Sequence, residues 1–181
     1  MTSPSRSTRL PPPLRFELAL ANEQSAIALH PRRIREALRT TLVDERVVRC
    51  ELSVAVVTDP QIHEINRQFL AHDEPTDVIT FELAPPERVT GVPLRPKGCP
   101  IRRGAALRIE GEIVVSAETA RRRAPEFGWT PHDELTLYLV HGVLHLCGYD
   151  DMSPGEVRLM RQRETEVLEQ LGLRPRATTS R

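Results

Sequence analysis

The chain has 181 residues, which suits one domain with free ends, and its 25 basic and 25 acidic side chains give no net charge. This balance excludes a field of the whole protein that attracts nucleic acid, so any contact with RNA must be local. Three widely spaced cysteines do not resemble a disulfide framework and favour a reducing, cytoplasmic location. No apolar run approaches the length of about 18 residues that spans a bilayer, and the first residues lack the apolar core of a secretory signal.

The sequence predicts a single domain over residues 14–173, between a disordered lead at 1–13 and a disordered tail at 174–181. Runs of alternating or β-branched apolar residues predict four strands, at 14–20, 47–57, 78–83 and 107–115. A helix separates the first two strands and another separates the second and third, so both connections allow parallel pairing. The third and fourth strands should pair in antiparallel fashion.

Capping residues mark five predicted helices. They begin at Pro31, at Asp59-Pro60, after Ser116, after Thr130 and after Ser153. The last of them ends at Gly172. The predicted fold class is therefore α+β: a mixed four-stranded sheet packed with about five helices, one of which carries histidines and lies buried against the sheet.

Residues 84–105 differ from the rest of the domain. They contain five prolines, three glycines and an excess of basic side chains, with no apolar period. A long loop of this kind is either a solvated flap or a functional segment. In the second case Arg102 and Arg103 are candidate RNA contacts.

The most informative stretch runs from His141 to Asp151 with the sequence HGVLHLCGYDD. His141 and His145 are four residues apart in an apolar run, so on a helix both imidazoles point to one side. Gly148 suits the left-handed turn that ends a helix, and this turn returns Asp150 or Asp151 towards the histidines. Two imidazoles and a carboxylate with a fourth position open are typical of a catalytic zinc site, whereas Cys147 lies on the opposite face and fits the core.

The spacing is that of the zinc-peptidase helix, H-E-x-x-H-x-x-G-x-x-H. Two positions depart from it: Gly142 replaces the glutamate that acts as general base, and Asp151 replaces the third histidine. The missing glutamate argues against peptide hydrolysis. The aspartate does not argue against zinc, because carboxylate oxygens are ordinary zinc ligands.

Four stretches together resemble the YbeY family of metal-dependent single-strand endoribonucleases. The histidine stretch resembles H-G-x-L-H-L-x-G-Y-D-H, residues 75–81 (PTDVITF) resemble P-T-D-V-L-S-F, and residues 111–116 (GEIVVS) resemble G-D-I-V-I-S. Ile65-Asn66 with Phe69 resembles L-N-x-x-[FY]-R. The resemblance runs from about residue 14 to about residue 173.

This resemblance implies a compact α+β domain and one zinc ion bound by His141, His145 and Asp151, with both histidines in the catalytic centre. It also implies cleavage of single-stranded RNA in the maturation of the 3′ end of 16S rRNA and in ribosome quality control, with the small ribosomal subunit as partner. Leu70 stands where the family has an arginine. Arg67, three residues earlier on the same predicted helix, is a candidate catalytic and RNA-binding substitute.

Two other functions stay open at this point. One is a zinc peptidase or another metal-dependent hydrolase with a different general base. The other is a non-catalytic, ribosome-associated factor with a structural metal, in which Leu70 marks the loss of cleavage.

Overall fold

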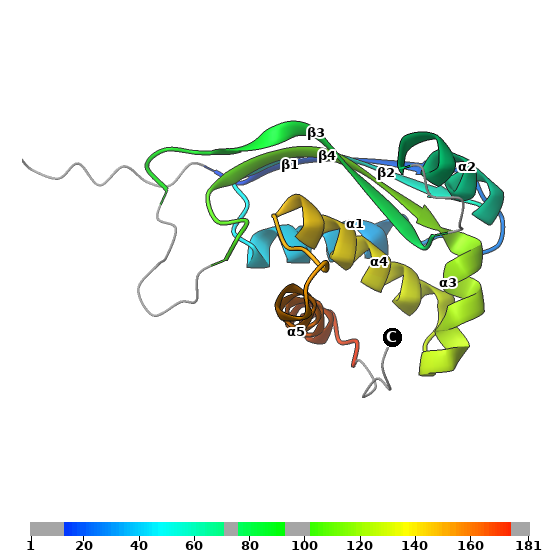
Figure 1. Ribbon diagram of the computed structural model, residues 1–181. Helices are drawn as coiled ribbons and strands as arrows, with labels where there is room; N and C mark the ends of the chain where they lie inside the picture. Colours follow the sequence, from blue (N-terminus) through cyan, green and yellow to red (C-terminus); the bar gives the residue numbers. More distant parts are fainter. Residues whose placement is uncertain (1–12, 71–75, 93–101, 175–181) are drawn as a thin grey trace, which may run out of the picture.

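The computed structural model describes residues 13–70, 76–92 and 102–174 (Figure 1). Within these ranges the chain forms four strands, β1 (Arg15–Asn22), β2 (Arg49–Val57), β3 (Val78–Arg88) and β4 (Leu107–Ser116). It also forms five α-helices and one short 3-10 helix: α1 (Pro31–Asp44), α2 (Asp59–Leu70), α3 (Ala117–Arg123), η1 (Ala124–Phe127), α4 (Pro131–Leu146) and α5 (Pro154–Gln170). The predicted α+β class with a mixed four-stranded sheet is confirmed.

The strand order is β1-β2-β4-β3, with β1 parallel to β2, β2 parallel to β4, and β3 antiparallel to β4. The predicted β3–β4 pairing is therefore confirmed, but parallel pairing of β2 with β3 is wrong, because β4 lies between them. Apolar residues on both faces of β4 suit a central position. β3 contains Pro85 and Pro86. Proline has no N–H to donate to a β-ladder, so it is found mainly in edge strands such as β3.

β3 also continues to Arg88, so the predicted loop at 84–105 begins five residues too early. Irregular pairing with β4 around Ala84 takes up the extra residues of this strand. Residues 93–101 of the loop lie outside the described ranges. So do most residues of the predicted lead at 1–13 and tail at 174–181.

The two faces of the sheet are covered differently. Helices α1 and α4 pack on one face, and α5 packs against both of them (Figure 1). This side holds the main core, which includes Leu38 of α1, Val54 of β2, Ile113 of β4 and Leu139 of α4. On the other face α2 closes a smaller cluster of Val57, Ile62, Ile79 and Val114. Alternate residues of one strand thus belong to different cores.

Glycines let α4 approach the sheet closely. A Cβ atom on Gly142 of the helix would lie 3.0 Å from side-chain carbons of Ile113, and one on Gly111 of β4 would lie 2.7 Å from Leu146 Cδ2. Gly142 therefore has a packing reason to lack a side chain. A side chain at this position would press against Ile113 and against Thr80 Oγ1 at 3.1 Å, so both neighbours would have to shift.

We expect Gly111→Ala to lower the free energy of unfolding by about 1–3 kcal/mol, since the new methyl group would also meet the Phe81 carbonyl oxygen at 2.9 Å. Gly155→Ala is the matched control, because its nearest neighbouring atom is 4.0 Å away and alanine favours a helix. Denaturant unfolding measures both. Equal stability of the two variants would contradict the close approach of α4.

Candidate metal centre

Helix α4 is fixed at its start by a capping box. The Thr130 side chain accepts a hydrogen bond from the Asp133 backbone N–H, and the Asp133 carboxylate accepts one from the Thr130 N–H at 3.0 Å. Pro131 occupies the first turn, as predicted. The helix is buried on most of its circumference, so its direction, and with it that of the histidines, is set by the core.

The end of α4 is a Schellman turn. Gly148 has a φ of +88°, its N–H bonds the His145 carbonyl oxygen at 2.8 Å, and the Tyr149 N–H bonds the Leu144 carbonyl oxygen at 3.1 Å. The predicted helix stop is confirmed. This turn reverses the chain and brings Asp151 back beside the histidines.

His141, His145 and Asp151 converge, with one possible ligand atom from each residue lying within 4.8 Å of the others. The two Nε2 atoms are 2.9 Å apart, and His141 Nε2 is 3.9 Å from Asp151 Oδ2. Tetrahedral ligands about 2.0–2.1 Å from a zinc ion are about 3.3 Å apart, so these separations bracket the required value. The group could therefore hold a metal ion.

The other nitrogen of each imidazole already has a partner. His141 Nδ1 lies 2.7 Å from Glu164 Oε1 of α5, and His145 Nδ1 lies 3.1 Å from the Tyr149 carbonyl oxygen. Both partners are acceptors, so each Nδ1 carries the proton and each Nε2 presents a lone pair. Two facing lone pairs repel each other unless a cation stands between them. This donor set fits a metal ion.

Burial lowers the pKa of both imidazoles, but the neighbouring groups leave the two pKa values shifted in opposite directions. At His141 the hydrogen bond and charge of Glu164, together with the charges of Asp151 and Asp77, outweigh burial, so its pKa lies above the usual value. At His145 burial is reinforced by the neighbouring His141, so its pKa lies below the usual value. His145 is therefore neutral at pH 7, the form in which an imidazole binds a metal.

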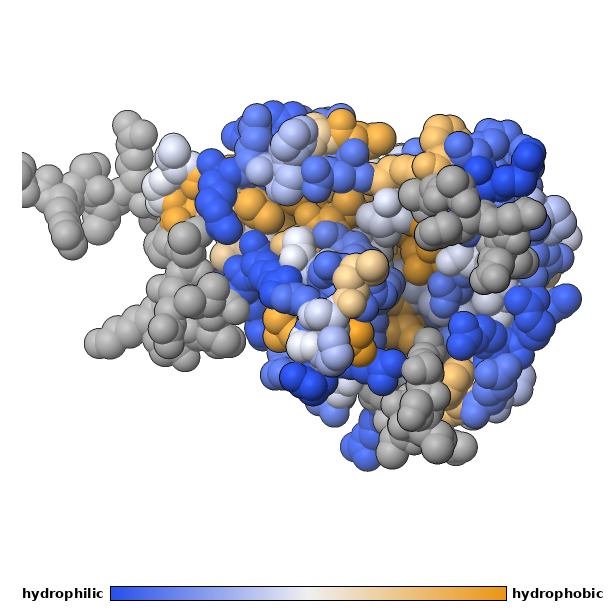
Figure 2. All heavy atoms as spheres, viewed as in Figure 1, coloured by the Kyte–Doolittle hydropathy of each residue, from blue (hydrophilic) through white to orange (hydrophobic). Residues whose placement is uncertain are grey.

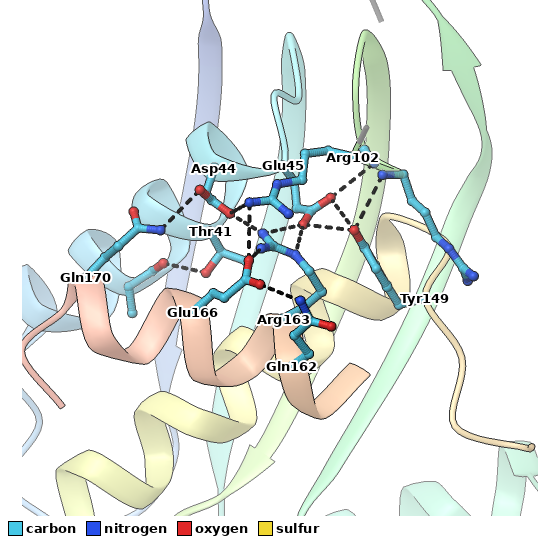
Figure 3. Close-up of polar contacts among 12 residues, drawn as sticks. Thr41, Asp44, Glu45, Arg102, Tyr149, Gln162, Arg163, Glu166 and Gln170 are labelled. Carbon is cyan, nitrogen blue, oxygen red and sulfur yellow. Dashed lines mark hydrogen bonds and ion pairs between the residues drawn. The ribbon is translucent and has the colours of Figure 1, made fainter. Parts of the chain in front are cut away.

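A buried charged network supports the turn after α4 (Figure 3). Glu45, at the end of α1, is fully buried and accepts hydrogen bonds from the Tyr149 hydroxyl at 3.1 Å and from Arg163 Nε at 2.9 Å. Arg163 of α5 is 1% exposed and also pairs with Asp44 and Glu166. Burial raises the pKa of Asp44, but the hydrogen bonds from Arg163 and Gln170 and the charges of Arg163 and Arg102 together leave that pKa below its usual value. The network thus ties α1, α5 and Tyr149, whose carbonyl oxygen orients His145.

The predicted RNA-contacting arginines have protein partners. Arg102 pairs with Asp44 and Glu166, and Arg103 bonds Glu156 and the Gly148 carbonyl oxygen and lies over the Tyr149 ring. RNA would have to compete with these carboxylates for both side chains, whose role in RNA binding stays a prediction. Arg67 of α2 pairs with Glu64 at 2.7 Å on the surface.

Sequence reasoning missed Glu164, Glu45 and Arg163. The sequence around Glu164 in α5 did not indicate that its side chain reaches the histidines, since a carboxylate on an amphipathic helix usually faces solvent. Cys147 was predicted correctly as a core residue: it is buried, and burial raises the pKa of its thiol well above the usual value. Such a thiol is a poor metal ligand.

Two histidines and a carboxylate, on a buried helix and the turn after it, are the donor set that is typical of metal-dependent hydrolases. Among the described residues no helix is both long and apolar enough to cross a membrane.

Comparison with known proteins gives the family. The family model described as endoribonuclease YbeY matches residues 19–172. An endoribonuclease YbeY of Pelotomaculum thermopropionicum is 34% identical over 154 residues, which cover 85% of this chain and 91% of that protein. One of Rhodopirellula baltica is 40% identical over 129 residues, covering 69% of this chain and 56% of that longer protein. The solution structure of TM1509 from Thermotoga maritima is 25% identical, with a TM-score of 0.51 over 86% of this chain and 92% of that one.

The chain therefore belongs to the endoribonuclease YbeY family. Its relatives are named as hydrolytic nucleases that act on RNA, which confirms the predicted class of enzyme. The resemblance seen in the four sequence stretches is confirmed as well.

Proposed function

We propose that this protein is a zinc-dependent endoribonuclease that cleaves single-stranded RNA, acting with the small ribosomal subunit in the cytoplasm on the 3′ end of 16S rRNA and in ribosome quality control. The observation that carries the proposal is the convergence of His141, His145 and Asp151 in a chain of this family. The rRNA site and the ribosomal partner come from the family resemblance.

Zinc held by these residues would lower the pKa of a water molecule and polarise the phosphodiester to be broken. The residues around the site keep both imidazoles in the form that binds a metal ion. Glu164 keeps a proton on His141 Nδ1 and the Tyr149 carbonyl oxygen keeps one on His145 Nδ1, so both Nε2 atoms stay available as ligands. The Asp151 side chain is 47% exposed, so an RNA strand can approach the site from solvent.

We expect the purified protein to contain zinc and to cleave single-stranded RNA, but not casein or short peptides, because Gly142 supplies no general base for peptide hydrolysis. His145→Ala should lose both the metal and the RNA cleavage. The same RNA annealed to its complement is the substrate control. Zinc-dependent peptide cleavage that disappears in His145→Ala would overturn the proposal.

Arg67 is the proposed substitute for the arginine expected at Leu70. Arg67→Ala should lower RNA cleavage by more than about tenfold, the loss of one charge-assisted contact of about 1.5–3 kcal/mol, while the fold is unaffected. Glu64→Ala is the matched control, because it removes the carboxylate that holds Arg67 and leaves the arginine for RNA. Unchanged cleavage in Arg67→Ala would mean that another cation serves or that none is needed.

Leu70 stands where the family has an arginine, and this change favours one other function: a ribosome-associated factor in which the metal is structural. Protein that holds zinc and binds small subunits but leaves single-stranded RNA intact would support this alternative.

A further inference from the structure

A cavity of about 290 Å³ lies beside His141, between α4, α5 and the beginning of β3. Its apolar lining includes Leu137 of α4 and Val157 and Met160 of α5. Figure 2 shows hydrophobic atoms in the recess where α4 passes between α5 and α3. The candidate metal ligands His141 and Asp151 also line the cavity, so a molecule that occupies it lies beside the metal centre.

Two arginines reach this cavity from different helices: Arg123 at the end of α3 and Arg161 in α5. The cavity is here called the Arg123–Arg161 cavity. Arg123 Nη1 is 3.6 Å from Asp77 Oδ2, and the two side chains are 35% and 29% exposed. This distance is too long for a hydrogen bond, and a partly exposed ion pair contributes little. Arg123 can therefore turn to a further anion at little cost from this pair.

The charges around the cavity favour an anion once a metal ion is bound. Three carboxylates line it: Asp77, Asp151 and Glu164. Glu164 bonds His141 Nδ1 at 2.7 Å, and Asp151 is a candidate metal ligand. Two arginines and a zinc ion carry four positive charges against the three negative ones, so the loaded site attracts a phosphate group.

A second hollow also borders His141 and runs along β3, with Thr80, His145 and Leu146 among its lining residues. Within the described part of the chain, no lysine or arginine lines this second hollow. Of the two hollows, only the Arg123–Arg161 cavity therefore brings cationic side chains to the metal centre. The planar fork of a guanidinium matches the oxygens of a phosphate, which every nucleotide of an RNA strand presents.

We propose that Arg123 and Arg161 together bind the phosphate next to the scissile one and so hold the RNA strand in the metal centre. This inference rests on the proposed function and adds a binding subsite to it. A phosphate carries no base sequence, so the subsite fixes the position of the strand without selecting its bases.

Exchanging either arginine for glutamine tests the subsite, because it removes the charge and keeps most of the side chain. In Arg123→Gln and in Arg161→Gln the KM for a single-stranded RNA should rise about tenfold, the loss of one charge-assisted contact, with kcat within about twofold. Arg121→Gln is the matched control: this residue lies on α3, is exposed and does not line the cavity, and its exchange changes the net charge equally. Its KM should change less than about twofold.

Salt and phosphate substitution make the test specific. Because both arginines bind one phosphate, the slope of log KM against log salt concentration should fall by about 0.7 in Arg123→Gln/Arg161→Gln, the value for one phosphate of a single strand. A neutral methylphosphonate at one of the two positions beside the cleaved phosphate should raise KM for the wild type but not for this double variant.

Two results would overturn the subsite and leave the proposed function intact. One is an equal effect of the methylphosphonate on the wild type and the double variant at both neighbouring positions. The other is a KM in Arg121→Gln that rises as far as in Arg123→Gln. A wild-type protein that cleaves no single-stranded RNA would overturn the proposed function, and the subsite with it.

Discussion

Asp151→Ala should lower zinc affinity by more than about 100-fold and abolish cleavage, because it removes a ligand, and loss of a supporting outer partner alone costs about 10–100-fold. Titration with a zinc chelator of known affinity measures the first effect and RNA cleavage the second. Asp150→Ala is the matched control: its Oδ1 accepts a hydrogen bond from the Asp151 N–H at 2.8 Å, so it should loosen the turn and do less harm. If Asp150→Ala lost the metal while Asp151→Ala kept it, the ligand assignment would be wrong by one residue.

Asp151→His should keep the metal and change the pH dependence. A carboxylate lowers the net charge of a zinc site from about +2 to about +1, so its water is polarised less than with three neutral imidazoles and has a higher pKa. Restoring the histidine should therefore move the alkaline rise of kcat/KM to lower pH. It should also reduce the ability of Mn²⁺ to replace zinc, since oxygen is a harder ligand than nitrogen. A rise that moves to higher pH would contradict this account of the aspartate.

Arg163→Met should lower the free energy of unfolding by about 3–5 kcal/mol, the largest stability effect that we expect. The substitution leaves Glu45 fully buried without the Arg163 cation and removes one of the two arginines that pair with Asp44, which keeps Arg102 at 3.5 Å. Denaturant unfolding at constant m-value measures the loss. The double variant Arg163→Met/Glu45→Leu should recover most of it, because both deeply buried charges are then absent. A single variant that loses less than about 1 kcal/mol would show that the pair behaves as a surface salt bridge.

Local signals in the sequence were sufficient for most of the elements and for the convergence of the two histidines of α4. Thr130 and Gly148 fix the two ends of α4 through hydrogen bonds to residues a few positions away, so their effect is readable from spacing alone. His141 and His145 share a face by helical geometry. The turn after Gly148 left Asp150 and Asp151 both open, and the family resemblance selected Asp151.

The rest depends on contacts between remote parts of the chain. β2 pairs with β4 across more than fifty residues, and no local pattern distinguishes this partner from β3. Arg163 and Glu45 are 118 positions apart, and each is a residue type that normally faces solvent. Their burial becomes visible only when α1 and α5 are seen side by side. The same holds for Glu164, which reaches His141 from another helix.

The central position of β4 has a consequence for synthesis of the chain. The N-terminal unit of β1, α1 and β2 emerges from the ribosome first, with the edge of β2 unpaired and Val54 and Val56 uncovered. That edge finds its partner only after residues 107–116 have followed, and α4 covers the sheet later still. An unpaired apolar strand edge is a template for aggregation. A nascent chain stalled before β4 would therefore be prone to self-association, whatever the stability of the finished fold.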